Sequence, residues 1–413
     1  MWRFPLIACA ILVGVIGACS WLLPERYAMN APMGNILWGA GIEAPAPEVV
    51  DQRMAVPEGF ELSLWAENVR GARVLRFTPT GDLIVSSPVQ NSILLLERDN
   101  DGDGRSDGQR VLLEDLAHPY GVDLHDGKLY VGETGALGRV DFDPGLPSSS
   151  GEPSGARLTG DFERIVSDLP PGGNHWTRSV RAGPDGWIYV HVGSSCNVCI
   201  EDDITRRAAL LRFRPDGSGE ESFATGLRNS VGFDWQPATG KLYATDNGRD
   251  LLGDDFPPCE LNELVEGGFY GFPIANGDRV PDPDFGEGQE QRIAASIPPA
   301  HDFNAHNAPL GINFVNDDDP LPSSMRGAAL VALHGSWNRT RKDGYKVVSL
   351  HWDEDGTVEE RDFLTGFLVD EDVSGRPADV LQGPDGAIYV SDDYAGVIWK
   401  VRYTGTPDGR PTS

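Results

Sequence analysis

Two stretches built on one plan decide the fold: GGNHWTRSVRAGPDGWIYVHVGSSCNVC at residues 172–199 and GLRNSVGFDWQPATGKLYATDNGRD at residues 226–250. In each stretch, polar residues precede a short strand, a turn with glycine follows, and a second, aromatic-rich strand runs into a polar loop. Short runs of β-branched and aromatic residues bounded by Gly, Pro, Asn and Asp are typical of β-strands joined by tight turns. Both stretches are therefore expected to be strand–turn–strand units with reactive side chains at their open ends.

The second half of this unit recurs along the chain. A turn glycine followed by an apolar or aromatic run occurs six times, at Gly81, Gly127, Gly186, Gly240, Gly327 and Gly386. The intervals of 46 to 87 residues contain no long stretch with the apolar spacing of a helix, so crossover helices are not expected. Repeats of about 50 residues with several strands each are typical of propeller blades. The sequence therefore predicts an all-β fold, a six-bladed β-propeller over residues 57–404.

A ring of blades is complete only when it closes, because closure leaves few exposed strand edges. We expect residues 60–66 (FELSLWA) to complete the last blade beside residues 397–403. The longest interval, which follows Gly240, predicts a large insertion between about residues 250 and 310, near the mouth.

Loops that enter the innermost strand of each blade and loops that leave its second strand lie on the same face of a propeller. Four of the eight histidines fall in these loops: His118, His175, His306 and His334. Arg228, Asn229, Arg376 and the segments 246–250, 334–339 and 392–393 fall there too. We therefore expect the functional site on this face.

The charge and the N-terminus limit the possible partners and the location. A net charge of −29 argues against a nucleic-acid partner and indicates a solvated acidic surface or affinity for cations such as Ca²⁺. Residues 4–23 are almost wholly apolar, and IGAC at 16–19 resembles a bacterial lipoprotein cleavage box ending at Cys19. Residues 1–23 are expected to be a signal peptide with a lipidated Cys19 or an uncleaved membrane anchor. Either places the protein outside the cytoplasm, in the periplasm, attached to the membrane.

Two short segments flank the expected domain. Residues 24–56, rich in Pro, Ala and Gly, are predicted to be a tether, and residues 405–413 a C-terminal tail.

Three of the five cysteines lie outside the targeting segment. Cys196 and Cys199 form a C-x-x-C pair, and Cys259 is single. In an oxidising compartment the pair predicts a local disulfide, with a redox dithiol as the alternative. A c-type haem would need His at position 200, which is Ile, and a zinc site would need a second pair.

An acidic segment at 99–107 (DNDGDGRSD) resembles a calcium loop. Asp99, Asp101, Asp103 and Asp107 occupy loop positions 1, 3, 5 and 9, and Gly104 occupies position 6. Position 12 is Arg110 in place of the usual Glu, and flanking helices are not expected. We predict a structural Ca²⁺ here, with a plain acidic turn as the alternative.

Eight motifs together resemble the soluble quinoprotein glucose/sorbosone dehydrogenases, most of all the L-sorbosone dehydrogenase-like branch, over about residues 57–404. They are PEGFELSLWAENVRGARVL, GNHWTRSVRAGPDGWIYV, GLRNSVGFDW, DNGRDLLGDDFPPCELNEL, GGFYGFP, HNAPLGINF, ALHGSWNRT and GRPADVLQGPDGAIYVSDD. The resemblance implies a six-bladed propeller that binds pyrroloquinoline quinone (PQQ) and Ca²⁺ at its mouth. It implies oxidation of an aldose, a sorbosone-like sugar aldehyde or a related carbinol by hydride transfer to the quinone. Electrons would pass to an external acceptor, a quinone or a cytochrome.

The resemblance also implies roles for particular residues. His175 would be the general base, since imidazole titrates near neutral pH. Arg228 and Asn229 would donate to the quinone oxygens as negative charge grows there. The main-chain carbonyls of Gly248 and Arg249 would bind the Ca²⁺, which prefers oxygen ligands, and Gly248 would allow an unusual backbone conformation.

The carboxylates of the cofactor need cations, and here the sequence departs from the pattern of the glucose dehydrogenases. Arg376 matches one family arginine, but a second arginine two residues on is replaced by Ala378. A family lysine on the fifth blade is replaced by Trp337-Asn338-Arg339. We expect Asn338 and Arg339 to contact the cofactor there, with Arg339 in the place of the lysine.

Two other functions remain open from the sequence. A Ca²⁺-dependent lactone hydrolase on a similar propeller would need the carboxylates of Glu133, Asp246 and Asp392 to converge on one metal. A non-catalytic propeller that binds a sugar or a protein would need no reactive base.

Overall fold

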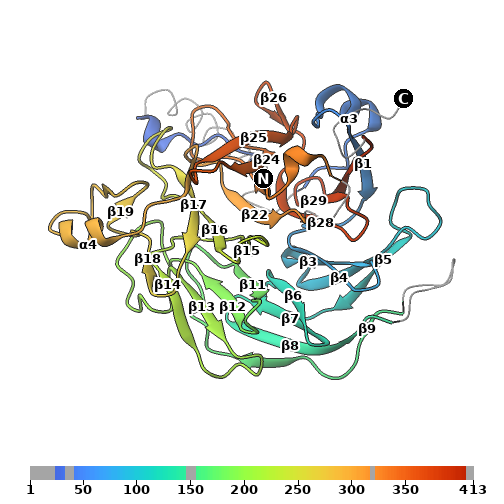
Figure 1. Ribbon diagram of the computed structural model, residues 1–413, viewed down its shortest axis with the longest axis horizontal. Coiled ribbons are helices and arrows are strands. Elements are labelled where there is room, and N and C mark those ends of the chain that lie inside the picture. The colour runs from blue at the N-terminus through green and yellow to red at the C-terminus, as the bar shows by residue number, and fades with distance from the viewer. Residues whose placement is uncertain (1–23, 33–40, 146–154, 317–320, 406–413) are drawn as a thin grey trace, which may run out of the picture.

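The computed structural model describes residues 24–32, 41–145, 155–316 and 321–405. Six β-sheets of four or five strands are arranged around a central axis (Figure 1), which confirms the predicted six-bladed β-propeller. The predicted signal or anchor segment at 1–23, with Cys19, and the tail from residue 406 lie outside the described residues. Within the described ranges, no helix is long and apolar enough to cross a membrane.

In each blade, four antiparallel strands follow one another from the axis outward, and in blade 3 the short β18 (Gly268–Phe269) pairs parallel with the outermost of them. Blade 1 contains β2 (Leu75–Phe77), β3 (Leu83–Ser87), β4 (Ser92–Glu97) and β5 (Gly108–Leu113). Blade 2 contains β6 (Val122–His125), β7 (Lys128–Glu133), β8 (Ala136–Asp143) and β10 (Glu163–Val166), and the short β9 (Arg157–Leu158) pairs with β8. Blade 3 contains β11 (Arg178–Ala182), β12 (Ile188–Val192), β13 (Ala209–Phe213) and β14 (Glu221–Thr225).

The remaining blades follow the same order. Blade 4 contains β15 (Phe233–Trp235), β16 (Leu242–Asp246), β17 (Cys259–Leu264) and β21 (His301–Phe303). Blade 5 contains β22 (Pro309–Phe314), β23 (Ala329–Leu333), β24 (Lys346–Trp352) and β25 (Val358–Leu364). Blade 6 contains β28 (Pro377–Gln382), β29 (Ile388–Asp392), β30 (Val397–Tyr403) and β1 (Phe60–Ala66).

Blade 6 closes the ring with strands from both ends of the chain. β1 pairs antiparallel with β30, from Phe60 opposite Tyr403 to Ala66 opposite Ile398. This pairing confirms the predicted closure. It also covers the edge of β30, which would otherwise expose unpaired backbone groups.

The second strand of a blade is buried along its whole length in five of the six blades, as in β3, β12, β16, β23 and β29. A blade packs one face against each neighbouring blade, so both faces of its second strand lie in apolar surroundings. Such a strand reads as a continuous apolar run and not as an alternating one. This burial is why the repeated aromatic and aliphatic runs are visible in the sequence.

Charged and polar side chains from the innermost strands form a ring around the axis. Arg76 of blade 1 contacts Asp123 of blade 2 (3.3 Å), and Arg181 of blade 3 contacts the same carboxylate (3.5 Å). Arg181 also pairs with Asp234 of blade 4 (2.7 Å), which accepts from Asn313 of blade 5 (3.2 Å).

The ring is completed through blade 6. The Asn313 side chain accepts from the backbone N–H of Gln382 (2.8 Å), and Asp379 accepts from the N–H of Leu75 in blade 1 (2.8 Å). Asp379 also lies 3.6 Å from the Arg76 guanidinium. Every blade is therefore linked to the next at the axis by a charged or amide side chain.

Glycines let the innermost strands come close enough for these contacts. A Cβ atom at Gly232 of blade 4 would lie 2.1 Å from the carbonyl oxygen of Leu310 in blade 5. A Cβ atom at Gly311 of blade 5 would lie 2.0 Å from a carboxylate oxygen of Asp379 in blade 6. No side chain fits at either position, so glycine is required by the close approach of the strands.

The predicted insertion lies between β17 and β21 and contains β18 (Gly268–Phe269), β19 (Ala275–Asn276), β20 (Val280–Pro281) and α4 (Glu290–Ala295). It leaves blade 4 at the end of β17 opposite the mouth. It then packs back toward the mouth, where Asp282 pairs with Arg249 (2.8 Å). The insertion therefore buttresses one loop of the mouth.

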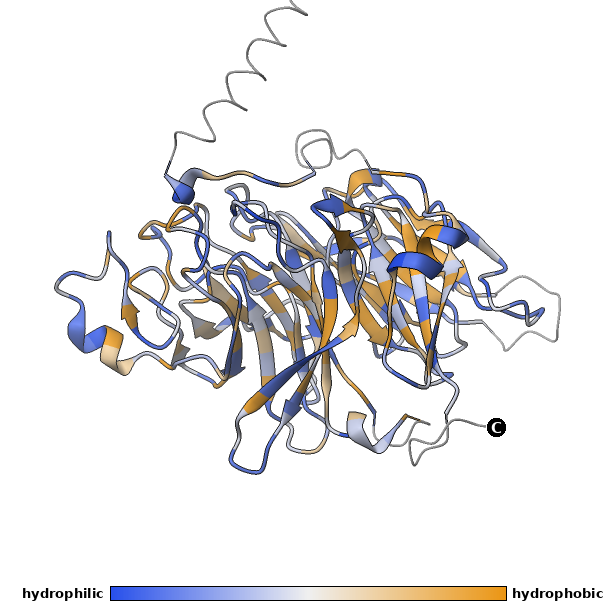
Figure 2. Ribbon diagram, turned by 90° about the horizontal axis from the view of Figure 1, so that it is seen from above, coloured by the Kyte–Doolittle hydropathy of each residue, from blue (hydrophilic) through white to orange (hydrophobic). Residues whose placement is uncertain are grey.

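The described part of the expected tether lies against the propeller. The short helix α3 (Pro47–Arg53) places Val50 against the core of blades 5 and 6, and the turn η1 (Glu25–Tyr27) lies at the mouth. Asn338 donates to the carbonyls of Arg26 (3.2 Å) and Ala28 (2.6 Å). Seen from the side (Figure 2), this segment crosses one end of the propeller. The remaining short elements are η2 (Pro88–Gln90), η3 (Ser323–Met325), β26 (Leu368–Val369) and β27 (Asp372–Val373).

The ring of charges makes a prediction about stability. Arg181→Ala leaves the carboxylates of Asp123 and Asp234 buried without their shared cation, so unfolding free energy should fall by about 3–5 kcal/mol. Lys241→Ala, which breaks the half-exposed pair with Glu263, is the matched control and should cost less than about 1 kcal/mol. Urea denaturation of both variants measures the difference. Equal losses in the two variants would show that the ring does not hold the blades together.

Candidate active site at the mouth

Ser194 joins the loops of blades 3 and 4 at the mouth. Its N–H donates to the carbonyl oxygen of Arg228 (2.9 Å), while its own carbonyl oxygen lies 2.8 Å from Nδ1 of His175. The Ser194 hydroxyl oxygen is 2.9 Å from the same nitrogen. His175 and Arg228 are therefore neighbours of one residue, on one face, as the sequence predicted.

These contacts fix the proton on the His175 ring. A carbonyl oxygen only accepts, and the Ser194 hydroxyl donates to the carbonyl of Cys196 (2.8 Å), so Nδ1 of His175 carries the hydrogen. Nε2 then holds the lone pair, and among the described residues nothing donates to it. Burial and the nearby charge of Arg228 lower the pKa of His175 to about 3. His175 is thus a neutral imidazole with an available Nε2.

Arg228 is held from several sides. Its Nη1 donates to the carbonyl of Asn247 (3.0 Å), and its Nη2 contacts the carboxylate of Asp250 (3.1 Å). Asp246 accepts from the backbone N–H groups of Arg228 (2.9 Å) and Asn229 (2.6 Å). The guanidinium is therefore placed by the loop that follows β16.

Asn229 lies beside the imidazole. A Cβ atom at Gly193 would be 2.6 Å from Cβ of His175 and 3.0 Å from Oδ1 of Asn229. That Oδ1 is buried and has no hydrogen-bond partner within the described part of the chain. A buried amide oxygen without a donor is costly, so this side chain is suited to receive a ligand.

Asp250 connects this group to blade 5. Nδ1 of His306 lies 3.4 Å from its carboxylate, and Nε2 of His306 donates to the carbonyl of Gly253 (2.8 Å). Burial alone would raise the pKa of Asp250, but the His306 hydrogen bond and the Arg228 charge outweigh it, so the pKa is lowered. Asp250 is therefore the ionised partner of Arg228.

Gly248 and Arg249, the predicted metal ligands, follow β16 at the mouth. Among described residues no donor contacts either carbonyl oxygen, so both remain available to a cation that prefers oxygen. The prediction that Gly248 has an unusual backbone conformation is wrong, since its φ is not in the left-handed region. A Cβ there would lie 2.4 Å from the carbonyl oxygen of Pro258, so close packing requires glycine. The Arg249 side chain instead points to Asp282 (2.8 Å) and Asp284 (3.0 Å).

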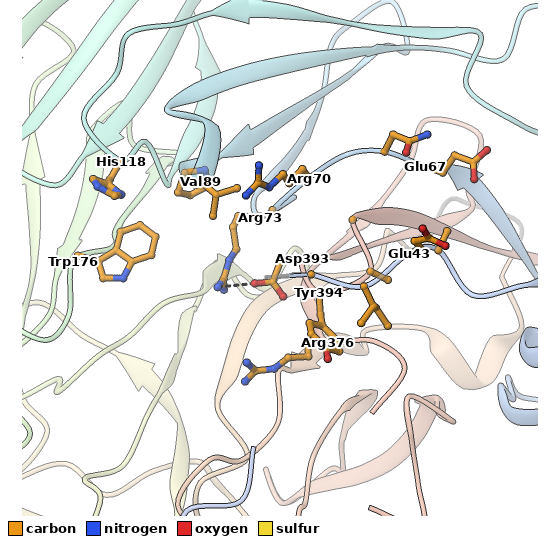
Figure 3. A pocket seen from close by; sticks show the side chains of 18 of the residues that line it. Glu43, Glu67, Arg70, Arg73, Val89, His118, Trp176, Arg376, Asp393 and Tyr394 are labelled. Carbon is orange, nitrogen blue, oxygen red and sulfur yellow. Dashed lines mark ion pairs between the residues drawn. The ribbon is translucent and has the colours of Figure 1, made fainter. Parts of the chain in front are cut away.

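Next to this group is a cleft of about 1280 Å³. Figure 3 shows Arg73, Arg376, His118 and Trp176 around it. Trp176, the residue after His175 in the chain, lines the cleft, but neither His175 nor Arg228 does. Arg70 also lines the cleft, and Glu43 and Glu67 lie toward its outer end (Figure 3).

A buried charge network forms one wall of the cleft. Asp393 pairs with Arg73 (2.8 Å) and with Nε2 of His334 (2.8 Å). Arg376 donates to the carbonyls of His334 (3.1 Å) and Gly335 (3.2 Å). Burial and the charge of Arg376 lower the pKa of His334 to about 3, so it donates as a neutral imidazole. Two guanidinium groups against one carboxylate make this wall cationic.

Other predicted residues have different partners. Asn338 is fully engaged, because it also accepts from the N–H of Leu251 (2.7 Å). Arg339 donates to the carbonyls of Asp254 and Ala305 and pairs with Asp255 (3.2 Å). Neither lines the cleft, so their contact with a cofactor stays a prediction.

The acidic segment at 99–107 joins β4 to β5, and strands flank it as expected. Carboxylate oxygens of Asp99, Asp101 and Asp107 lie within 4.8 Å of one another, and Asp103 accepts from the N–H of Arg105 (2.8 Å). Asp99 also accepts from the N–H groups of Gly102 (2.6 Å) and Gly104 (2.9 Å). These bonds are those of an acidic turn, and a bound Ca²⁺ stays a prediction.

Arg70 and Arg73 were missed by the sequence analysis. Both lie in the loop between β1 and β2, which enters the innermost strand of blade 1. Like His118, His175 and Arg228, they are polar residues that precede an innermost strand, and this position in the sequence is the signal that identifies them.

The fold and the mouth define a class of protein: a six-bladed propeller with a neutral histidine and paired arginines beside a wide cleft. The chain belongs to the TrAA12-like family, whose model matches residues 54–256 and 282–404. The unmatched interval, 257–281, overlaps the insertion in blade 4. This membership confirms the resemblance to the quinoprotein sugar dehydrogenases.

Individual relatives agree with this placement. An uncharacterized protein of Borreliella burgdorferi is 28% identical over 367 residues, covering 87% of this chain and 93% of the relative. The pyrroloquinoline quinone-dependent pyranose dehydrogenase of Coprinopsis cinerea is 23% identical over 440 residues, covering 89% of this chain but 57% of that enzyme. This chain thus spans little more than half of the length of that dehydrogenase.

Two solved structures share the fold. The holo PQQ domain of the Coprinopsis cinerea pyranose dehydrogenase superposes with a TM-score of 0.68 at 21% identity, covering 87% of this chain and 98% of the domain. A calcium structure of the Trichoderma reesei AA12 enzyme has a TM-score of 0.70 at 19% identity, covering 88% and 99%.

A buried histidine beneath the mouth gives a prediction about pH. His191 accepts from the N–H of Ser230 (3.2 Å), and burial lowers its pKa to about 3. Its contribution to stability is complete above the pKa of about 6.5 in the unfolded chain and is lost as the pH falls toward 3. Between pH 7 and 5, the wild-type protein should lose roughly 2 kcal/mol more unfolding free energy than His191→Gln. Denaturant titrations of both proteins at pH 7 and pH 5 measure the unfolding free energies. If the free energies of the two proteins differ by the same amount at both pH values, the lowered pKa of His191 is contradicted.

Proposed function

We propose that this protein is a PQQ- and Ca²⁺-dependent dehydrogenase that oxidises an aldose or a related sugar. The observation that carries the proposal is the neutral His175, with Nε2 available, beside Arg228 and at the same mouth as a cleft with Arg73 and Arg376 on one wall. The name of one relative supports it: the Coprinopsis cinerea enzyme that aligns with 89% of this chain is a PQQ-dependent pyranose dehydrogenase.

The residues at the mouth fit the cofactor. PQQ carries three carboxylates, and Arg73 and Arg376 present guanidinium groups on one wall, with Arg70 nearby. A cleft of about 1280 Å³ exceeds the ~300–1,000 Å³ of ordinary ligand sites, so it has room for a cofactor and a sugar together. The unpartnered carbonyls of Gly248 and Arg249 would hold Ca²⁺. When bound, PQQ would supply the hydride acceptor and Ca²⁺ would supply a Lewis acid beside it.

A residue of this chain takes up the proton of the sugar hydroxyl. Nε2 of His175 accepts the proton of the sugar hydroxyl, and the bond from Nδ1 to Ser194 keeps the ring oriented and in the correct tautomer. Burial and the charge of Arg228 keep the imidazole neutral before it accepts that proton. Arg228 has five N–H donors and four acceptors within the protein, so one Nη1 donor remains for an oxygen on which negative charge develops.

The substrate, acceptor and location belong to the same proposal. A sorbosone-like aldehyde or an aldose fits the polar mouth, and an external quinone or cytochrome would take the electrons. The Cys196–Cys199 disulfide supports a site of action outside the cytoplasm, in the periplasm, to which the segment at 1–23 would tether the protein.

The lactone hydrolase has less support. Glu133 pairs with Arg164 (2.6 Å), Asp246 accepts backbone N–H groups of blade 4, and Asp392 accepts those of Arg376 (2.8 Å) and Ala395 (3.0 Å). Within the described residues these three carboxylates form no common group that could hold a metal.

Reconstitution tests the proposal. Purified apoprotein is incubated with PQQ and Ca²⁺, and bound-quinone absorbance and dye reduction are recorded with a panel of aldoses. Bound quinone together with sugar-dependent dye reduction is expected. Bound quinone without turnover would favour a binding propeller, and lactone cleavage without quinone binding would favour the hydrolase.

The role of His175 gives a separate prediction. His175→Gln removes the base and should lower kcat by about 10²–10⁴-fold, with quinone binding retained. His351→Gln, on β24 at the opposite end of blade 5, is the control and should keep full activity. Because the neutral form of His175 exists above a pKa of about 3, wild-type kcat should show no acid limb near pH 6.5. Stopped-flow dye reduction from pH 5 to 8 measures both, and an active His175→Gln would refute the assignment.

A further inference from the structure

We infer that Asn197, inside the Cys196–Cys199 disulfide loop, is a positioning residue that orients Arg228 for the reaction. The inference rests on the proposed function for its catalytic meaning. The contacts that carry it belong to the protein alone, so they can be tested without cofactor. The sequence predicted only a local disulfide at this loop.

Asn197 takes two of the four hydrogen bonds that the Arg228 guanidinium makes within the protein. Its main-chain carbonyl accepts from Nε (2.8 Å), and its side-chain Oδ1 accepts from Nη2 (2.9 Å). These two nitrogens lie along one edge of the planar guanidinium, so paired acceptors fix both its position and its plane. A single acceptor would leave the plane free to rotate.

Asn197 is itself held rigidly by blade 4. Its Oδ1 also accepts from the N–H of Asp250 (2.9 Å), and its Nδ2 donates to the Asp250 carbonyl (3.1 Å). The amide thus bridges the loop after β12 to the loop after β16, and it uses both ends of its side chain to do so. With Asp250 also on Nη2 of Arg228, three residues form one closed set of bonds.

The disulfide fixes the backbone on both sides of Asn197. Cys196 and Cys199 are bonded, so Asn197 and Val198 lie in a closed loop of four residues. The carbonyl of Cys196 accepts from the hydroxyl of Ser194, the residue that orients His175. One small loop therefore contacts the supports of both the base and the arginine, at the junction of blades 3 and 4.

The consequence concerns Arg228 more than substrate binding. Its remaining N–H must point to one place, and a displacement of about 1 Å can cost roughly 10² in rate. Since Asn197 does not line the cleft, its loss should leave the cofactor wall of Arg73 and Arg376 unchanged.

The test compares Asn197→Ala with Val198→Ala, a change in the same loop at a side chain that makes no polar contact. Apoprotein with ¹⁵N-labelled arginine is used first. The Nη2–H signals of Arg228, assigned by their loss in Arg228→Lys, should exchange with solvent at least tenfold faster in Asn197→Ala, which removes their Oδ1 acceptor, and be unchanged in Val198→Ala. The double variant Cys196→Ser/Cys199→Ser should show faster exchange as well. Unchanged exchange in Asn197→Ala would overturn the inference, whatever the activity of the protein.

Kinetics of the reconstituted protein then separate positioning from general stability. In Asn197→Ala, kcat should fall roughly 10²-fold while KM for the sugar changes less than threefold. Asn197→Asp, which keeps a side-chain oxygen for Arg228, should recover part of the loss. Full kcat in Asn197→Ala, or an equal loss in Val198→Ala, would contradict the inference. A wild-type protein that exchanges as expected but oxidises no sugar would refute the proposed function and leave the orientation of Arg228 by Asn197 established.

Discussion

The ring of charges at the axis is the interaction on which the rest of the structure depends. Arg76, Asp123, Arg181, Asp234 and Asp379 come from five innermost strands, and Asn313 supplies the sixth position. Alternating cations and anions satisfy one another where neighbouring strands approach most closely, in a place with little access for water. Because each blade is bound to the next at this point, the start of every innermost strand has a fixed place. The loops that enter those strands form the mouth.

Because the ring is closed, site residues from different blades contact one another at the mouth. Arg73 pairs with Asp393, Asp393 with His334, and Arg376 with the carbonyl of His334. On the opposite side, His306 contacts Asp250, Asp250 contacts Arg228, and Ser194 links Arg228 to His175. Trp176, which follows His175 in the chain, lines the cleft together with Arg73 and Arg376. No blade holds both a cationic wall and a neutral base, so the chemistry exists only in the closed ring.

The burial of each histidine suits this arrangement. His175 and His334 both have a lowered pKa, and both are neutral at physiological pH. The positive charge beside these two histidines is therefore carried by Arg228 and Arg376. In a chain of net charge −29, the wall with Arg73 and Arg376 attracts anions at one place while the acidic surface repels them elsewhere.

The blades could be predicted from the sequence because the buried second strand of each blade recurs as an apolar run. The second strands are apolar on both faces, and FELSLWA at 60–66 was recognisable as a strand that could pair with the last one. The same reasoning gathered His175, Arg228 and Arg376 on one face. It could not assign partners, since Arg249 turns away to Asp282 and Asn338 binds the N-terminal segment.

Residues whose role depends on tertiary distance were not visible in the sequence. Arg76 and Arg181 are single charges in short strands, and nothing in their spacing shows that they meet at an axis. Asn197 reads as an ordinary residue between two cysteines, and its contacts with Arg228 arise only when blades 3 and 4 pack together. Gly248 was correctly singled out, but the need for it comes from the carbonyl of Pro258, ten residues later in the chain.

A crystal structure of the protein with PQQ and Ca²⁺ tests the central claim most directly. The account predicts carboxylates of the quinone on Arg73 and Arg376, Ca²⁺ on the carbonyls of Gly248 and Arg249, and Nε2 of His175 facing the space left for a sugar. Quinone bound away from the mouth, or bound there with His175 directed elsewhere, would contradict it.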